Sequence, residues 1–147
     1  VLAGAGEAVQ IDTLAPGYEM LNGPLDEIDF VSLGCPHASL EELRRIAGGL
    51  AGRRTRALLW VTVSEKVRQE AEREGLVRLI EEAGGHVVAD TCLVVVPVEA
   101  LGVRSLATNS AKAALYARSH SGLETRFGTT EQCLEAAISG RWPGSAA

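Results

Sequence analysis

Apolar positions along the chain fall into two repeating patterns that indicate strands and helices in turn. Strands are expected where apolar residues alternate or run continuously up to turn residues, over 27–34, 56–63, 86–90, 104–109 and 123–127. Helices are expected where apolar residues recur every three or four positions, over 39–51, 64–83, 110–120 and 129–140. Residues 91–97, TCLVVVP, fit neither pattern.

Local signals mark where several helices begin and end. Ser39 with Glu42 and Thr129 with Gln132 form capping boxes, in which each side chain binds a backbone N–H group left unpaired at a helix start. Ser64 can cap the second helix, and the glycine pair at 84–85 ends it.

The alternation of strand and helix predicts the fold class. Crossovers of this length allow parallel pairing, so we expect an α/β, three-layer, doubly wound and mostly parallel sheet flanked by helices. A chain of 147 residues with 46% hydrophobic content suits one such domain. We expect a weakly patterned N-terminal segment (1–27), the α/β domain (28–142) and a flexible tail (143–147).

Charge and composition argue against several classes of partner. The net charge of −5 disfavours nucleic acid, and the basic run Arg53, Arg54 and Arg56 is expected in a solvated turn. No apolar run reaches the roughly 20 residues that a membrane span needs, and VLAGAGEAVQ at the start does not resemble a signal peptide. Three cysteines without a CxxC pattern favour a reducing cytoplasm over a disulfide scaffold.

Three cysteines occupy the positions where parallel sheets bind ligands. Cys35 follows the first strand, Cys92 follows the third strand, and Cys133 lies near the start of the last helix. All three therefore lie at the carboxyl edge of the sheet, if the strand order brings their crevices together. Such a set suits an iron–sulfur cluster or zinc, and a thiolate near a helix start can also be a nucleophile. A buried, inert thiol is the alternative for each.

A second group of polar residues follows the fourth strand, in TNSAKAALY. Asn109, Ser110 and Lys112 lie where that strand gives way to a helix, so they can form a pocket for a carboxylate or phosphate. The alternative is an ordinary serine cap with a solvated lysine. His37, two residues after Cys35, is a ligand, a proton donor, or a residue that binds its own backbone at the helix entry.

Four segments, in order, resemble the aconitase X family: DFVSLGCPHASLEEL, AGGHVVADTCLVVVP, TNSAKAALYARS and GTTEQCLEAAISGRW. The resemblance runs from about Asp29 to Trp142 and implies an aconitase-like domain of a hydro-lyase that uses an iron–sulfur cluster. It implies dehydration of a small hydroxy acid, either cis-3-hydroxy-L-proline or mevalonate 5-phosphate. We expect cis-3-hydroxy-L-proline, because Lys112 alone provides little positive charge for binding a phosphate.

The resemblance also implies roles for the residues singled out above. Cys35, Cys92 and Cys133 would hold a cluster of the two-iron (2Fe-2S) or four-iron (4Fe-4S) type. Asn109, Ser110 and Lys112 would bind the anionic group of the substrate. His37 and Ser110 would be catalytic, with His37 orienting the substrate or passing a proton.

The resemblance covers only the carboxyl-terminal portion of the family's large part. Family members join several such domains to a small swivelling part, which is fused or a separate subunit. We therefore expect the remaining large-part domains and the small part as partners, and no dehydratase activity from this chain alone. The competing hypotheses are a non-catalytic metal- or thiol-binding α/β module, and a domain that serves only assembly.

Overall fold

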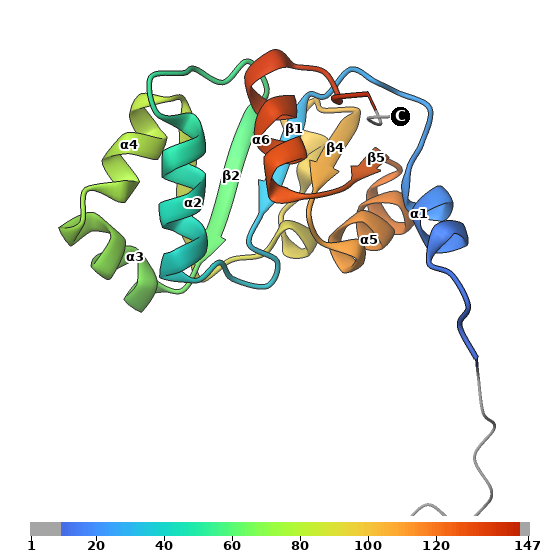
Figure 1. Cartoon of the computed structure of the whole chain (residues 1–147), viewed down its shortest axis with the longest axis horizontal. Coiled ribbons are helices and arrows are strands. Elements are labelled where there is room, and N and C mark those ends of the chain that lie inside the picture. The colour runs from blue at the N-terminus through green and yellow to red at the C-terminus, as the bar shows by residue number, and fades with distance from the viewer. Residues whose placement is uncertain (1–9, 145–147) are drawn as a thin grey trace, which may run out of the picture.

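Five short segments form one fully parallel sheet, which confirms the predicted fold class. A computed structural model describes residues 10–144 and places the strands in the order β3-β2-β1-β4-β5 (Figure 1). The strands are β1 (Phe30–Leu33), β2 (Leu58–Val63), β3 (Gly85–Ala89), β4 (Ser105–Thr108) and β5 (Glu124–Phe127).

The strand order reverses direction in the middle of the sheet. The chain starts at the central strand β1, continues outward to β2 and β3, and then returns to place β4 on the other side of β1. Ser32 of β1 pairs with Trp60 of β2 on one side and with Thr108 of β4 on the other. The loops that leave β1 and β4 therefore diverge at a topological switch point, where open α/β sheets bind ligands.

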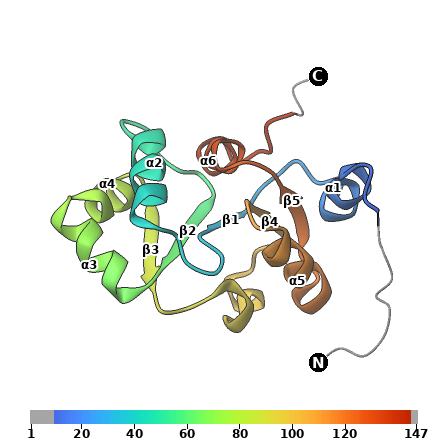
Figure 2. The same cartoon turned by 60° about the horizontal axis from the view of Figure 1, so that its bottom comes forward.

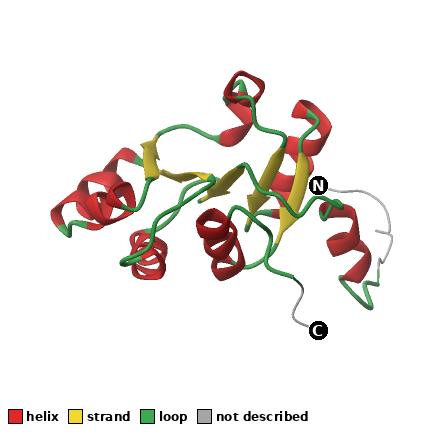
Figure 3. Ribbon diagram, turned by 90° about the horizontal axis from the view of Figure 1, so that it is seen from above, coloured by secondary structure: helices red, strands yellow, loops and turns green. Residues whose placement is uncertain are grey.

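Helices cover both faces of the sheet (Figure 3). One face carries α2 (Leu40–Leu50), α3 (Glu65–Arg73), α4 (Leu76–Glu82) and α6 (Thr130–Ser139). The other carries α5 (Ala111–Ser121) and two 3-10 helices, η1 (Leu93–Val95) and η2 (Val98–Leu101). A further helix, α1 (Ala15–Leu21), packs beside β5 and α5 at the edge of the molecule (Figure 1).

The apolar core is divided into two clusters by the sheet. Val31 and Leu33 of β1 belong to the cluster under α2, α4 and α6, whereas Phe30 belongs to the cluster under α5 and η1. This division follows from the alternation of side chains along a strand. Because both faces are covered, the central strands β1 and β2 are largely apolar, which made them recognisable in the sequence.

The structure corrects the expected single helix over 64–83. Two helices, α3 and α4, occupy this range, and Gly75 separates them with a left-handed backbone (φ 74°). Glycine adopts this conformation without the penalty that a Cβ atom imposes, so it permits a sharp break between two helical patterns.

Three further segments, α1, η1 and η2, become regular where no helix or strand was expected. Residues 93–95, within the ambiguous segment 91–97, form η1. Residues 15–21, within the segment expected to be weakly patterned, form α1, which has a proline in its first turn. None of its residues is buried, which explains why no apolar pattern predicted it. Of the expected flexible tail, residues 145–147 lie outside the described residues.

No helix within residues 10–144 combines the length and the apolar character that crossing a bilayer would require.

Candidate functional site

The turn that carries Cys35 is held firmly against the neighbouring strand β2. Gly34 has a left-handed backbone (φ 83°), and a Cβ atom there would overlap the carbonyl oxygen of Thr62. Thr62 Oγ1 lies 2.6 Å from the carbonyl oxygen of Gly34 and can donate to it, and the N–H of Ala38 donates to the Thr62 carbonyl at 2.8 Å. Cys35 is half-buried against the α5-side cluster, next to a cis bond to Pro36.

Cys92 lies on the loop that leaves the edge strand β3. Asp90 adopts a positive φ of 50°, donates its N–H to the Val63 carbonyl, and accepts the N–H of Glu65 at the start of α3. The following segment, with η1, runs past β2 and β1 and packs on α5 (Figure 2). Cys92 is half-buried, and its Sγ accepts the N–H of Val94 at 3.4 Å.

Ser110 caps helix α5, as the simpler of its two interpretations predicts. Its hydroxyl accepts the N–H of Ala113 at 3.2 Å, and its own N–H donates to the Thr108 hydroxyl. Lys112 is exposed, with Nζ 5.9 Å from the ring centre of Tyr116, a cation–π distance. These contacts account for the local structure, and a role in binding an anion stays a prediction.

Asn109 connects the loops that follow β4 and β5. Its side-chain amide donates to the hydroxyl of Thr130, at the start of α6, at 3.1 Å. This contact leaves the carbonyl end of the Asn109 side chain available for another partner. His37 is exposed, in the turn between Cys35 and α2.

Cys133 lies on α6, which follows the edge strand β5 but packs against the central strands of the sheet. It lies in the second turn of α6, which packs over β1, β4 and α2. Its side chain is fully buried in the α2-side cluster. Burial, with a smaller contribution from the nearby charge of Glu131, raises the pKa of this thiol to about 12.

The three thiols thus come from segments that converge on β1 and β4, but the structure does not gather them into a ligand set. Among the residues described, no three His, Cys, Asp or Glu side chains are grouped closely enough to hold a metal ion. The thiols of Cys35 and Cys92 fit a soft metal in chemistry and accessibility, whereas Cys133 is held as a neutral thiol in the core. The three-cysteine assignment stays a prediction.

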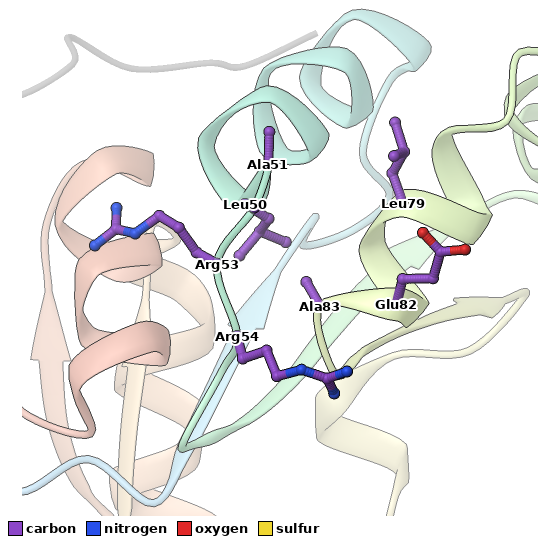
Figure 4. Close-up of a pocket in the computed structure, with 8 residues that line it drawn as sticks. Leu50, Ala51, Arg53, Arg54, Leu79, Glu82 and Ala83 are labelled. Atoms are coloured by element: carbon purple, nitrogen blue, oxygen red, sulfur yellow. The ribbon is translucent and has the colours of Figure 1, made fainter.

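A separate hollow of about 270 Å³ lies at the opposite edge of the sheet (Figure 4). It is formed by the ends of α2 and α4 and the loop between α2 and β2, with Arg54 and Glu82 at its rim. Arg53 also lines it, and its guanidinium pairs with Glu135 of α6 at 2.8 Å. The basic run is therefore a partly ion-paired turn that contacts α6.

Sequence reasoning missed three residues that hold this edge in place. Thr62, Asp90 and Thr130 fix the loops of Cys35, Cys92 and Asn109 respectively. Only Thr62 left a signal, as the one hydroxyl-bearing residue in the apolar run LLWVTV.

Cys35 and Asn109 lie on loops that leave adjacent parallel strands at the reversal of strand order. Together with the helices on both faces, this arrangement defines a doubly wound α/β domain, and open sheets of this kind bind ligands at the carboxyl edge. The family model of the aconitase X third domain matches residues 28–139. The chain belongs to the aconitase X family.

Characterised relatives and a solved structure agree with this membership. The chain is 42% identical over 128 residues to the phosphomevalonate dehydratase large subunit of Methanocaldococcus jannaschii, which covers 87% of this chain and 32% of that protein. It is 39% identical over 120 residues to the cis-3-hydroxy-L-proline dehydratase of Pseudomonas aeruginosa, covering 79% and 21%. The crystal structure of Thermococcus kodakaraensis aconitase X (holo-form) superposes with a TM-score of 0.77 at 35% identity, covering 84% of this chain and 32% of the other. The chain therefore spans about a third or less of these relatives.

Proposed function

We propose that this chain is the third domain of a hydro-lyase that dehydrates a small hydroxy acid. The observation that carries the proposal is that the Cys35 and Asn109 loops leave the adjacent strands β1 and β4 at the switch point of the sheet. Both relatives described above are named dehydratases, which supports the same reaction class.

Cys35, Cys92 and Cys133 are the proposed ligands of an iron–sulfur cluster. Such a cluster, when bound with one iron position open, supplies a Lewis acid for a departing hydroxyl group. For Cys133 the cost of binding is highest, because its thiol must leave a dry core environment and lose a proton. Cluster binding therefore includes a local rearrangement at the start of α6.

The substrate's anionic group is proposed to bind at the start of α5. The first N–H groups of that helix, the Asn109 side-chain amide N–H groups and the Ser110 hydroxyl all lie at this end. Lys112 adds a positive charge on an exposed side chain. His37, exposed in the turn after Cys35, is proposed to orient the substrate or to carry a proton, and Ser110 is proposed as a second catalytic residue.

Between the two substrates of the relatives, we propose mevalonate 5-phosphate first and cis-3-hydroxy-L-proline second. This reverses the order expected from Lys112. The phosphomevalonate relative is more similar (42% against 39%), and its match extends over more of this chain (87% against 79%). A phosphate need not rely on Lys112, because the start of α5 presents backbone N–H groups as well.

The chain is proposed to act only with partners, in a reducing cytoplasm. It spans about a third of a protein named as a large subunit, so the partners are the remaining domains of such a subunit and a small subunit or domain. The three free thiols are compatible with that compartment.

The test is complementation. The chain is mixed anaerobically with the missing large-part domains and the small subunit, and dehydration of both substrates is measured. Activity is expected only in the complete mixture. Turnover of either substrate by the chain alone, or none from the complete mixture with an intact cluster, would contradict the proposal.

A further inference from the structure

We infer that Thr62 is a positioning residue that fixes the Cys35 thiol at the carboxyl edge of the sheet. The inference rests on the proposed function, because it matters only if Cys35 serves the site. Thr62 lies on β2, does not neighbour Cys35 in sequence, and touches its turn rather than the thiol itself.

The first line of evidence is that Thr62 alone contacts several backbone groups of the turn that carries Cys35. Thr62 Oγ1 lies 3.2 Å from the Leu33 carbonyl oxygen, 2.6 Å from that of Gly34 and 3.4 Å from that of Pro36. A hydroxyl has one proton, so the bond to Gly34 dominates and the other two carbonyls lie within its reach. The Thr62 carbonyl accepts the N–H of Ala38, so Cys35 is enclosed between two anchored points.

The second line of evidence is that the turn around Cys35 is packed too tightly to adopt a different backbone position. Thr62 is 2% exposed, so water cannot replace its hydroxyl as a donor to the carbonyls above it. Gly34 lies so close to the Thr62 backbone that no side chain fits between them. Removing the hydroxyl at constant size therefore leaves the Gly34 carbonyl without its donor and loosens the turn around Cys35.

Substituting a residue that only stabilises β2 would change the reactivity of all exposed thiols together, whereas substituting a positioning residue changes the reactivity of Cys35 selectively. Thr125 provides a matched control. It is 1% exposed, and its hydroxyl donates to the Leu21 carbonyl at 2.7 Å. It lies on the edge strand β5, however, which is separated from β2 by β1 and β4.

The experiment measures alkylation by iodoacetamide at Cys35 and Cys92 in the metal-free, reduced chain, with each site resolved by mass spectrometry. In Thr62→Val we expect the Cys35 rate to rise about five- to tenfold, the effect of losing one buried hydrogen bond, while Cys92 stays within about twofold. Thr62→Ser, which keeps the hydroxyl, and Thr125→Val should leave the Cys35 rate within about twofold of the unmodified chain.

An unchanged Cys35 rate in folded Thr62→Val, or an equal rise at both cysteines, would overturn the inference. If Thr62→Val does not fold, Thr62→Ala against Thr62→Ser decides, because the pair differs in the hydroxyl alone; equal Cys35 rates would then reject it. Iron binding by the unmodified chain is measured separately. A folded chain that binds no iron but shows the selective Cys35 effect would contradict the proposed function and leave the positioning role intact.

Discussion

At the scale of single residues, the site depends on backbone positions that only certain side chains allow. Gly34 combines a left-handed φ of 83° with close approach to Thr62 and Ala38. Asp90, at φ 50°, tolerates a less common conformation because its carboxylate caps α3. Both residues directly precede the loops of Cys35 and Cys92, so the geometry of the thiols is set by their neighbours.

Gly34→Ala is expected to lower the free energy of unfolding by about 3 kcal/mol or more, because it adds a backbone clash to a strained φ. Gly52→Ala is the control. Gly52 has φ 71° with nothing within 4 Å of an added Cβ, so its cost should be about 1 kcal/mol. Urea unfolding of both variants measures the difference, and equal costs would show that the close contact with Thr62 does not exist in solution.

The three thiols are expected to react at very different rates in the metal-free chain. Cys133 is fully buried and its pKa is raised to about 12, so at neutral pH it is almost entirely the unreactive thiol form. Site-resolved alkylation should be at least about a hundredfold slower at Cys133 than at Cys35 or Cys92. In concentrated urea all three rates should converge. Comparable labelling of Cys133 in the folded chain would contradict its placement in the core.

The sequence predicted the positions of Cys35, Asn109 and Ser110 well, because strand ends and helix starts are local signals. It did not predict the function of Thr62, whose partners lie 26 to 29 residues away. Burial was an open alternative for each cysteine, and the sequence could not assign it to Cys133 in particular, because the register of a helix over a sheet depends on long-range packing.

At the scale of elements, local chemistry determines where helices start. Both predicted capping boxes are present: Ser39 with Glu42 and Thr129 with Gln132 exchange side-chain and backbone bonds at 2.8 to 3.2 Å. The break at Gly75 was missed because the apolar pattern continues through α3 and α4, and only the glycine's conformation separates them. Helix α1 was missed because it buries nothing.

Ser39→Ala is expected to cost about 1 kcal/mol of unfolding free energy, since the N–H of Glu42 loses its acceptor. Ser119→Ala is the comparison variant, because Ser119 is exposed within α5 and its hydroxyl binds only the Tyr116 carbonyl of its own helix. That change should be neutral within about 0.5 kcal/mol. Thermal or urea unfolding distinguishes them, and a Ser39→Ala effect no larger than that of Ser119→Ala would argue against the capping box.

At the scale of the whole molecule, the strand order decides which distant residues meet. The predicted convergence of the three cysteines assumed that strand order would bring their crevices together. Instead, β3 and β5 are the two edges of the sheet, and the η1 segment and α6 return toward β1 and β4. Loop paths of this kind follow from tertiary packing, so sequence spacing alone could not establish them.

The central claim is that this domain holds an iron–sulfur cluster through Cys35, Cys92 and Cys133. The direct measurement is iron and acid-labile sulfide per chain after anaerobic reconstitution, in the unmodified chain and in the Cys35→Ser, Cys92→Ser and Cys133→Ser variants. We predict a brown chain with about two to four irons, and loss of most of that iron in every variant. A folded unmodified chain that retains no iron, or a variant that keeps its full content, would contradict the account.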